Sequence, residues 1–367
     1  MFFANGTVFG NWIARIPDVQ EGLGIGEGVL GLALLGAAVG ALLAMPAAGW
    51  LVSRLGSRPV TAVSAVLFCS FLPLLALAPS AVYLGLALFL FGAGNGLMDV
   101  SMNSQAVAVE RRYGRSIMAS FHAMFSFGGL VGAGMGGLAA SLGAELVPHF
   151  LGAAAVFVVV VLLVGRWLLP AAEDAAASGP AFARPTRALA LLGFVAFCAL
   201  LAEGAMADWS AVYLRGTLEA GPGMAAAGFA AFSLAMALGR LSGDYFIERF
   251  GAVTILRTGG LLAASGLGLS LLAGGPYLAL VGFVLVGAGL STLFPIVLST
   301  ASRAPGMTPG AAIASMATTG YFGFLIGPPV IGFAAELVTL RGALALVVVL
   351  AAAIALLARS ADPRKKL

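Results

Sequence analysis

A polar stretch, NGLMDVSMN, follows the apolar run YLGLALFLFGAG and places Asn95, Asp99 and Asn103 four residues apart. Residues at this spacing lie on one face of a helix. A carboxyl group there can exchange a proton, and the two amides can hydrogen-bond a hydroxyl-bearing solute. An aspartate at mid-bilayer costs about 2.5–3.5 kcal/mol on insertion scales, which makes it a candidate for function. A polar stripe that only holds this helix to its neighbours is the plainer interpretation, and for the two asparagines it is equally favoured.

The next helix supplies a candidate partner for Asp99. If the spans on either side of Arg111 form an antiparallel hairpin, Asp99 and His122 both lie about 17 Å from the turn. Such a pair can carry a proton, orient a substrate hydroxyl or only satisfy each other, and we assign both residues to proton coupling. Ser126, one turn beyond His122, is a candidate substrate-binding residue. His149 falls in an expected loop and receives no role.

A second polar segment, AEGAMADWSAVYLRG, adds Glu203 and Asp208. Glu203 lies about 22 Å into its helix, close to mid-bilayer, and Asp208 follows about one and a half turns later. We assign Glu203 to proton coupling and Asp208 to substrate binding. Trp12 either stacks on a sugar or sits in the interfacial aromatic belt, whereas the belt is favoured for Trp209. Asn5, two turns from Trp12 on a similar face, is a further substrate-binding candidate together with Trp12.

The chain that carries these groups is an integral membrane protein by composition. Of its 367 residues 61% are hydrophobic and only 9% are charged, with a mean hydropathy of +1.06, whereas soluble domains have about a quarter charged residues. The net charge of +4 comes from basic residues spread over short loops, which argues against nucleic acid as a partner. Cys69 and Cys198 lie inside apolar runs, and we expect neither a disulfide framework, nor a metal site, nor a cofactor.

Segments long enough to cross an apolar layer of about 30 Å determine the expected fold. Twelve occur in the chain, which predicts an all-α polytopic membrane protein with twelve transmembrane helices in two six-helix pseudo-symmetric bundles. The expected spans are 1–16, 28–52, 59–78, 81–109, 116–141, 147–169, 188–214, 223–247, 253–273, 277–302, 307–337 and 342–359.

The longest polar connection, residues 170–187, divides these spans six and six. We expect an N-terminal six-helix bundle over 1–169, a cytoplasmic linker over 170–187, and a C-terminal six-helix bundle with a short basic tail over 188–367. Basic residues favour the cytoplasmic side of a membrane protein. With both termini inside, fifteen of the nineteen lysines and arginines fall on the cytoplasmic side and three, Arg15, Arg215 and Arg341, on the other. We therefore expect a multi-pass protein of the cytoplasmic (inner) membrane.

The two halves repeat one another at an offset of 195 residues. Arg54-Leu55-Gly56 returns as Arg249-Phe250-Gly251, and Gly92-Ala93-Gly94 returns as Gly287-Ala288-Gly289. Several shared offsets in matching helices indicate a duplicated six-helix unit. Two parallel repeats around a midplane site are the build of a rocking transporter.

The segment GWLVSRLGSR, between the second and third spans, resembles the loop signature of the major facilitator superfamily. Ser53 stands where that signature usually has an aspartate. The cytoplasmic contact that this aspartate normally makes is therefore not expected in this chain. The conformational-loop residues implied by the match and by its repeat are Gly49, Arg54, Gly56, Arg58, Arg249 and Gly251.

The resemblance covers the whole chain in span count, repeat and loop charge, and GNGLMDVSMNSQ followed by SFHAMFSFGG is similar to the fucose-permease-like branch. The resemblance implies that the first, fourth, seventh and tenth helices line a central cavity. Glu203, on the seventh helix, would then be one of the residues that line it. We expect a monomeric secondary active transporter in the lipid bilayer. Its partners would be protons and a small polar, sugar-like solute, moved by alternating access as in a symporter.

The main alternative within transport is proton-driven efflux of drugs or metabolites. An enzyme is not expected, because HExxH, GxSxG and phosphate-binding glycine–lysine motifs do not occur in the chain. The missing phosphate loop also argues against ATP-driven transport by this chain. A membrane receptor or scaffold would carry a sizeable soluble domain, and the longest loop here has only the length of a linker.

The charge asymmetry of the loops makes the orientation testable. Epitope tags placed at residue 1 and after Leu367 should both resist protease added to intact cells, because both ends are expected inside. The tags should become accessible once the cells are permeabilised. Digestion of either tag on intact cells would contradict the orientation and the even number of spans.

Overall fold

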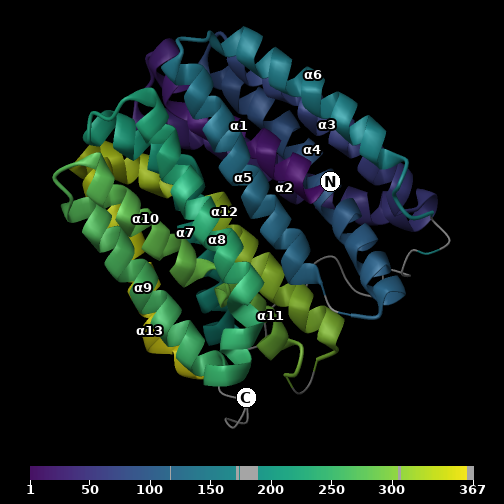
Figure 1. The fold of residues 1–367 in the computed structure, drawn as a ribbon. Coiled ribbons are helices and arrows are strands. Elements are labelled where there is room, and N and C mark those ends of the chain that lie inside the picture. Colours follow the sequence, from purple (N-terminus) through teal and green to yellow (C-terminus); the bar gives the residue numbers. More distant parts are fainter. Residues whose placement is uncertain (116, 171–172, 174–188, 305–306, 362–367) are drawn as a thin grey trace.

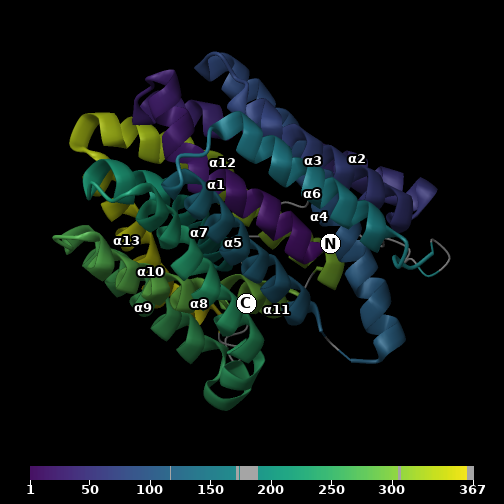
Figure 2. The ribbon, with the colours of Figure 1, turned by 45° about the horizontal axis from the view of Figure 1, so that its top comes forward.

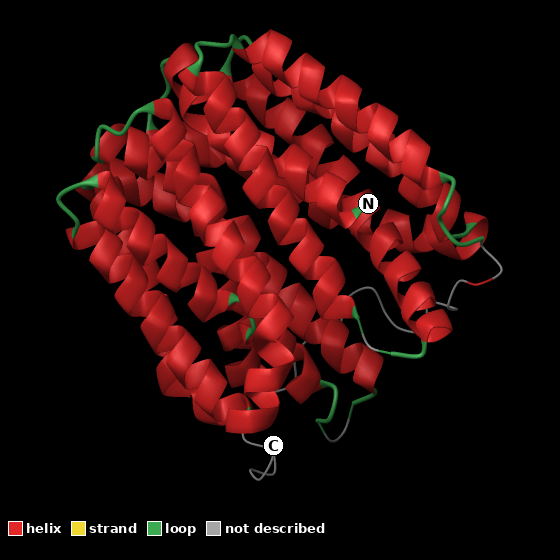
Figure 3. Ribbon diagram, in the orientation of Figure 1, coloured by secondary structure: helices red, strands yellow, loops and turns green. Residues whose placement is uncertain are grey.

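The computed structural model describes residues 1–115, 117–170, 173, 189–304 and 307–361. All regular secondary structure in these residues is helical (Figure 3), and none of them forms a strand. The predicted linker over 170–187 lies outside the described residues apart from residues 170 and 173.

Eleven helical spans in the described residues are long and apolar enough to cross a membrane, and the more polar α1 precedes them. The predicted all-α membrane fold is thus confirmed. One span is divided at Ser291 and Thr292 into α10 and α11, and a π-helix, η3 (Tyr213–Thr217), extends α7. The α-helices are α1 (Phe2–Leu23), α2 (Glu27–Leu55), α3 (Ser57–Ala76), α4 (Ala81–Tyr113), α5 (Met118–Ser141), α6 (Leu146–Gly165), α7 (Ala190–Val212), α8 (Pro222–Phe250), α9 (Ala252–Leu272), α10 (Pro276–Leu290), α11 (Leu293–Ala301), α12 (Pro309–Val338) and α13 (Leu340–Leu357).

The helix ends lie close to the expected span ends, with one exception. The first span was predicted to stop at residue 16, but α1 continues through Pro17 to Leu23. Arg15 is buried and forms an ion pair with Asp18 one turn later, so these charges stay inside the helix instead of ending it. The helix stops at Gly24, whose φ of 61° is readily adopted by glycine.

The helices form two bundles (Figure 1), α1–α6 in purple to teal and α7–α13 in green to yellow. In the first bundle α1 packs on α5 and α2 on α4, and in the second α7 packs on α12 and α9 on α10. The bundles meet along two seams, α5 against α8 and α2 against α12, and the turned view in Figure 2 shows the same division. These seams are equivalent under the repeat, because α2 corresponds to α8 and α5 to α12.

The backbone conformation is also repeated at equivalent positions of the two bundles. Gly56 joins α2 to α3 at φ 86° and ψ 159°, and Gly251 joins α8 to α9 at φ 80° and ψ 153°. Only glycine adopts such angles at little cost. The guanidinium of Arg54 lies over the Trp50 ring at 5.1 Å, and Arg249 donates to the hydroxyl of Tyr245, the residue at the position equivalent to Trp50. These contacts support the interpretation of the chain as a duplicated unit.

Close approach between the bundles is concentrated at one end of the seams. We call the end where α1 finishes and α2 begins the α1–α2 end, and the opposite one the α2–α3 end. A Cβ atom added at certain glycines would meet the other bundle, and apart from Gly129 near the middle these glycines lie toward the α1–α2 end: Gly26, Gly28, Gly31, Gly137, Gly223 and Gly332. The α1–α2 end is therefore the closed one in this arrangement.

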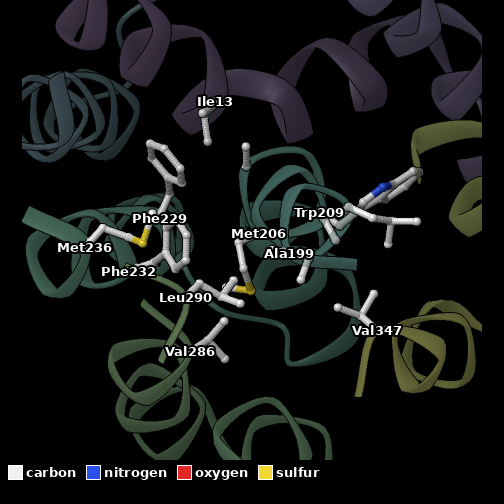
Figure 4. Close-up of a cluster of buried hydrophobic side chains, with 14 of the residues drawn as sticks. Ile13, Ala199, Met206, Trp209, Phe229, Phe232, Met236, Val286, Leu290 and Val347 are labelled. Carbon is white, nitrogen blue, oxygen red and sulfur yellow. The ribbon is translucent and has the colours of Figure 1, made fainter. Parts of the chain in front are cut away.

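Buried aromatic residues fill the second bundle. Trp209 on α7 is 0% exposed and lies in an apolar cluster with Met206 of the same helix, Phe229 of α8 and Val347 of α13 (Figure 4). The prediction that Trp209 belongs to the interfacial belt is therefore wrong. Trp12 is 2% exposed, so it is not a belt residue either.

Two glycines of α5 bring this helix against α1. A Cβ atom at Gly132 would collide with the Thr7 carbonyl oxygen, and one at Gly136 would come within 2.6 Å of the Ala14 side chain. The four-residue spacing of these glycines predicts such packing, since small residues let membrane helices approach closely. Gly134 lies between them on the exposed side and has no atom within 4 Å of an added Cβ.

Replacing Gly132 with leucine should therefore lower the free energy of unfolding by at least about 1–3 kcal/mol, because the α1 backbone cannot move aside. The measurement is the melting temperature and the monodisperse yield of the purified protein in detergent. Gly134→Leu is the matched control and should be neutral or slightly stabilising, since leucine favours a helix more than glycine. Equal melting temperatures for both variants would contradict the close packing of α5 on α1.

Candidate functional site

The predicted polar face of α4 exists. Asn95, Asp99 and Asn103 lie four residues apart and therefore share one face of the helix. All three are half-buried, so other parts of the protein cover this face in part. The amide nitrogen Nδ2 of Asn103 donates to the Asp99 carboxylate at 3.0 Å and to the Asp99 carbonyl oxygen at 2.9 Å. Asn103 therefore serves first as a hydrogen-bond donor to Asp99.

Tyr321 on α12 reaches Asp99 from the opposite bundle. Its phenol group interacts electrostatically with the carboxylates of Asp99 and Glu203. Sequence reasoning missed this residue. The signal was present, because Tyr321 follows the candidate Ser126 by the repeat offset of 195 residues.

Arg240 on α8 is a second residue that sequence reasoning missed. Its Nη2 donates to the Glu203 carboxylate on α7 at 3.0 Å. Its Nη1 donates to the Ser126 hydroxyl at 2.7 Å and to the His122 carbonyl oxygen at 3.5 Å, both on α5. Arg240 lies ten residues before the end of α8, so its depth in the helix was the available signal.

His122 is not the partner of Asp99. Its imidazole packs edge-on against the Phe2 ring, with 5.5 Å between the ring centres, and it interacts electrostatically with Arg240. Among the described residues, the hydrogen bond to the Asp99 carboxylate comes from Asn103. The expected Asp99–His122 pair is therefore absent from this arrangement, although the two residues belong to neighbouring parts of one polar region.

Asn5 joins α1 to the same polar face. It is 1% exposed, and its amide nitrogen donates to the Asn95 side chain at 2.9 Å and to the Met98 sulfur at 3.3 Å. Asp208 is half-buried on α7, and none of the described residues forms a hydrogen bond or ion pair with it. Among the residues that the structure describes, the Asp208 carboxyl group thus has no hydrogen-bond or ion-pair partner.

The conformational-loop residues lie at the α2–α3 end. Arg58 donates to the Arg166 carbonyl oxygen at 3.3 Å, and Gly49 is free of atoms within 4 Å of an added Cβ. Ser53 donates to the Trp50 carbonyl oxygen of its own helix at 2.8 Å. Arg54 and Arg249 contact aromatic rings of their own helices.

A second polar cluster, which the sequence did not predict, lies toward the α1–α2 end. His149 is not in a loop but near the start of α6, where one ring nitrogen lies 3.0 Å from the Asn11 side-chain oxygen and the other 3.2 Å from Arg15. Arg15 also pairs with Asp18 and donates to the Ala144 carbonyl oxygen at 2.9 Å. This cluster fixes α1 against α6 and explains why a charged residue is buried there.

The central groups suit proton exchange and hydrogen bonding more than covalent catalysis. Two carboxyl groups, a guanidinium, an imidazole and a phenol come together from α4, α5, α7, α8 and α12. Among the described residues no group of three or more histidine, cysteine, aspartate or glutamate side chains could hold a metal ion.

Comparison with known proteins agrees with this fold. The model of the Major Facilitator Superfamily matches residues 1–306 and 192–367. An uncharacterised MFS-type transporter of Yersinia pestis is 38% identical over 360 residues, which cover 98% of this chain and 93% of that protein.

Two solved structures have the same fold at low identity. A D-xylose–proton symporter has a TM-score of 0.76 at 13% identity and covers 99% of this chain and 96% of its own. A variant of the E. coli fucose:proton symporter has a TM-score of 0.64 at 18% identity and covers 98% of this chain and 96% of its own. The fucose symporter does not stand out, so the resemblance to its branch is not specifically supported. The family match and the relative of 38% identity show that the chain belongs to the Major Facilitator Superfamily.

Proposed function

We propose that the protein is a proton-coupled secondary active transporter of a small polar, sugar-like solute. The observation that carries the proposal is the environment of Asp99. Its carboxylate receives a hydrogen bond from Asn103 on α4 and interacts electrostatically with Tyr321 on α12, but it forms no ion pair with the described residues. A carboxyl group between two bundles with no cation beside it is suited to bind a proton.

The energetics of the bilayer give this proton a role in transport. A charged carboxyl group is penalised far more than a neutral one inside a membrane. If the bundles rock so that Asp99 faces first one side and then the other, the group gains a proton on the more acidic side and loses it on the other. Net movement of solute then follows the proton gradient. Glu203 is the second coupling candidate, although its pairing with Arg240 already compensates its charge.

The remaining side chains favour a neutral polar solute. Asn95, Asn103 and Tyr321 offer amide and hydroxyl groups that match the hydroxyls of a sugar. The Arg240 guanidinium of the central group is paired with Glu203, so an anionic solute gains little there. The fold neighbours that are sugar–proton symporters agree with this assignment of solute class.

We place the protein as a monomer in the cytoplasmic membrane with both termini inside, in accordance with the loop charges. Its domains would then be the two bundles over 1–169 and 188–367. The loops at Gly56 and Gly251 would act as equivalent rigid corners when the bundles rock. Proton-driven efflux of drugs or metabolites uses the same machinery in the opposite direction, and the direction of solute movement in vesicles separates the two.

Asp99→Asn preserves the shape of the side chain and removes its titration. In proteoliposomes this variant should lose accumulation against a gradient, so that internal and external solute concentrations become equal, while exchange of solute down its own gradient continues. The measurement is uptake of a radiolabelled sugar panel under an imposed pH gradient, with a pH-sensitive dye reporting proton movement. Asp244→Asn, at an exposed carboxyl group near the end of α8, is the matched control and should accumulate solute like the wild type.

Accumulation by Asp99→Asn at the wild-type ratio would show that Asp99 only holds helices together. Glu203 would then become the leading coupling residue. No movement of any sugar by the wild type, together with export of cationic or aromatic compounds from the same vesicles, would replace the proposed solute class with the efflux alternative.

A further inference from the structure

A cavity between α8, α9 and α10 lies outside the polar centre of the molecule. Its volume is about 400 Å³, and α10 packs on both of the other helices. Leu238, Phe246 and Val284 line it with large side chains that are exposed on the protein surface. Small-molecule sites have volumes of about 300–1,000 Å³, so this α8–α10 cavity is large enough to hold a ligand.

The α8–α10 cavity faces away from the first bundle. On α8 it is lined by Gly239, Ser242 and Phe246, whose spacing of three and four residues places them on one face of the helix. Arg240, which contacts α5, precedes Ser242 by two residues and therefore points to nearly the opposite side. In a membrane protein the face of α8 that turns away from the other bundle is bordered by lipid.

The lining of the cavity is suited to hydrocarbon. The hydroxyls of Ser242, Thr258 and Ser291 each donate to a carbonyl oxygen of their own helix at 2.9 Å. Thr292 turns its methyl group toward Gly243. The remaining lining residues are glycines and apolar side chains. A sugar-like solute would find few free hydrogen-bonding groups there, whereas an acyl chain requires none.

The cavity has the depth of one lipid leaflet. Along α8 it extends from Phe246 to Ala235, which lie about 8 Å and about 24 Å from the corner at Gly251, at 1.5 Å per residue. This corner is equivalent to Gly56 and belongs to the α2–α3 end. The cavity thus reaches from near the membrane surface to about the middle of an apolar layer about 30 Å thick.

An arginine continues the same face of α8 toward the membrane surface. Arg249 follows Phe246 by three residues and is exposed. It donates to the Tyr245 hydroxyl at 3.0 Å, lies over the Phe250 ring at 5.8 Å, and forms no ion pair with the described residues. The exposed rings of Tyr245, Phe246 and Phe250 pack on one another, with 5.4 Å and 6.3 Å between neighbouring centres. Exposed aromatic rings are typical of the level of the lipid headgroups.

The other charged residues nearby point elsewhere. Asp244 and Glu248 follow Arg240 by four and eight residues, so they lie on its face of α8 and not on that of the cavity. On α9, Arg257 follows the cavity residue Ile255 by two residues and points to nearly the opposite side of that helix. No charged residue occurs in α10. The charge on the cavity's own face of α8 is therefore positive.

We propose that the α8–α10 cavity binds one acyl chain of an anionic phospholipid from the leaflet at the α2–α3 end, with Arg249 binding the phosphate of its headgroup. The planar guanidinium matches a phosphate group, and its charge lacks a protein counter-ion, so a headgroup with a net negative charge is preferred. The site involves neither Asp99 nor Glu203, and it is independent of the solute that the protein carries.

Native mass spectrometry of the full chain in detergent tests the proposal directly. The protein is titrated with phosphatidylglycerol or phosphatidylcholine of the same chain length, and the mass of the intact complex reports the lipid that remains bound. The wild type should retain one phosphatidylglycerol with an affinity about tenfold higher than that for phosphatidylcholine, the effect of a hydrogen bond to a charged group.

Two pairs of variants separate the chain from the headgroup. Ala288 is exposed in the cavity, so Ala288→Phe should fill it and abolish retention of both lipids, whereas Ala155→Phe, at an exposed alanine in the middle of α6, should bind like the wild type. Arg249→Gln should lower the affinity for phosphatidylglycerol about tenfold, to that for phosphatidylcholine. Arg257→Gln is its matched control and should keep the preference.

Equal effects of Arg249→Gln and Arg257→Gln, or equal wild-type affinities for the two lipids, would overturn the proposal. Retention of phosphatidylglycerol by Ala288→Phe at the wild-type level contradicts the placement of the chain. If that variant fails to fold, short-chain phosphatidylglycerol on the wild type replaces it, because equal affinities for short and long chains lead to the same contradiction. Displacement of the lipid by millimolar inorganic phosphate would identify a plain anion site and also refute the proposal.

Discussion

Polar groups inside a bilayer must find their partners within the protein, and this constraint shapes the centre of the molecule. Lipid offers no hydrogen bonds, so an unpaired charge or amide is costly there. Several polar side chains pair with one another: Asn5 of α1 with Asn95 of α4, Arg240 of α8 with Glu203 of α7, and, within α4, Asn103 with Asp99. Neither Asp99 on α4 nor Asp208 on α7 forms an ion pair with a cation of the described residues.

The duplicated architecture places these local pairs beside the interface between the two bundles. Equivalent seams, α5 on α8 and α2 on α12, join the bundles, and glycines allow the backbones to approach closely at the α1–α2 end. From equivalent positions, Ser126 and Tyr321 extend polar groups across the interface. The polar groups of the centre therefore lie at the surface where the two bundles meet.

The α1–α2 end has its own polar network. Within the first bundle, α1 is held against α6 by the contacts of His149 with Asn11 and Arg15, and Arg15 also pairs with Asp18. Between the bundles, Glu21 pairs with Arg215 at 3.0 Å. At the same end the Glu336 carboxylate accepts a hydrogen bond from the Gly28 backbone nitrogen in the first turn of α2 at 3.1 Å, where the helix dipole favours negative charge. Closure of this end therefore combines close packing at glycines with polar contacts between the bundles.

The sequence by itself determined the class of fold, the number of spans, the repeat and the polar face of α4. These follow from local rules: apolar length, glycine spacing and the four-residue period of a helix. It also identified Gly132 and Gly136 as packing residues. The tertiary structure alone decided which polar groups meet. Depth along a helix does not specify the direction in which a side chain points. As a result, Asp99 was matched with His122 instead of Tyr321, Arg240 was missed, and Trp209 was placed at the membrane surface although it is buried.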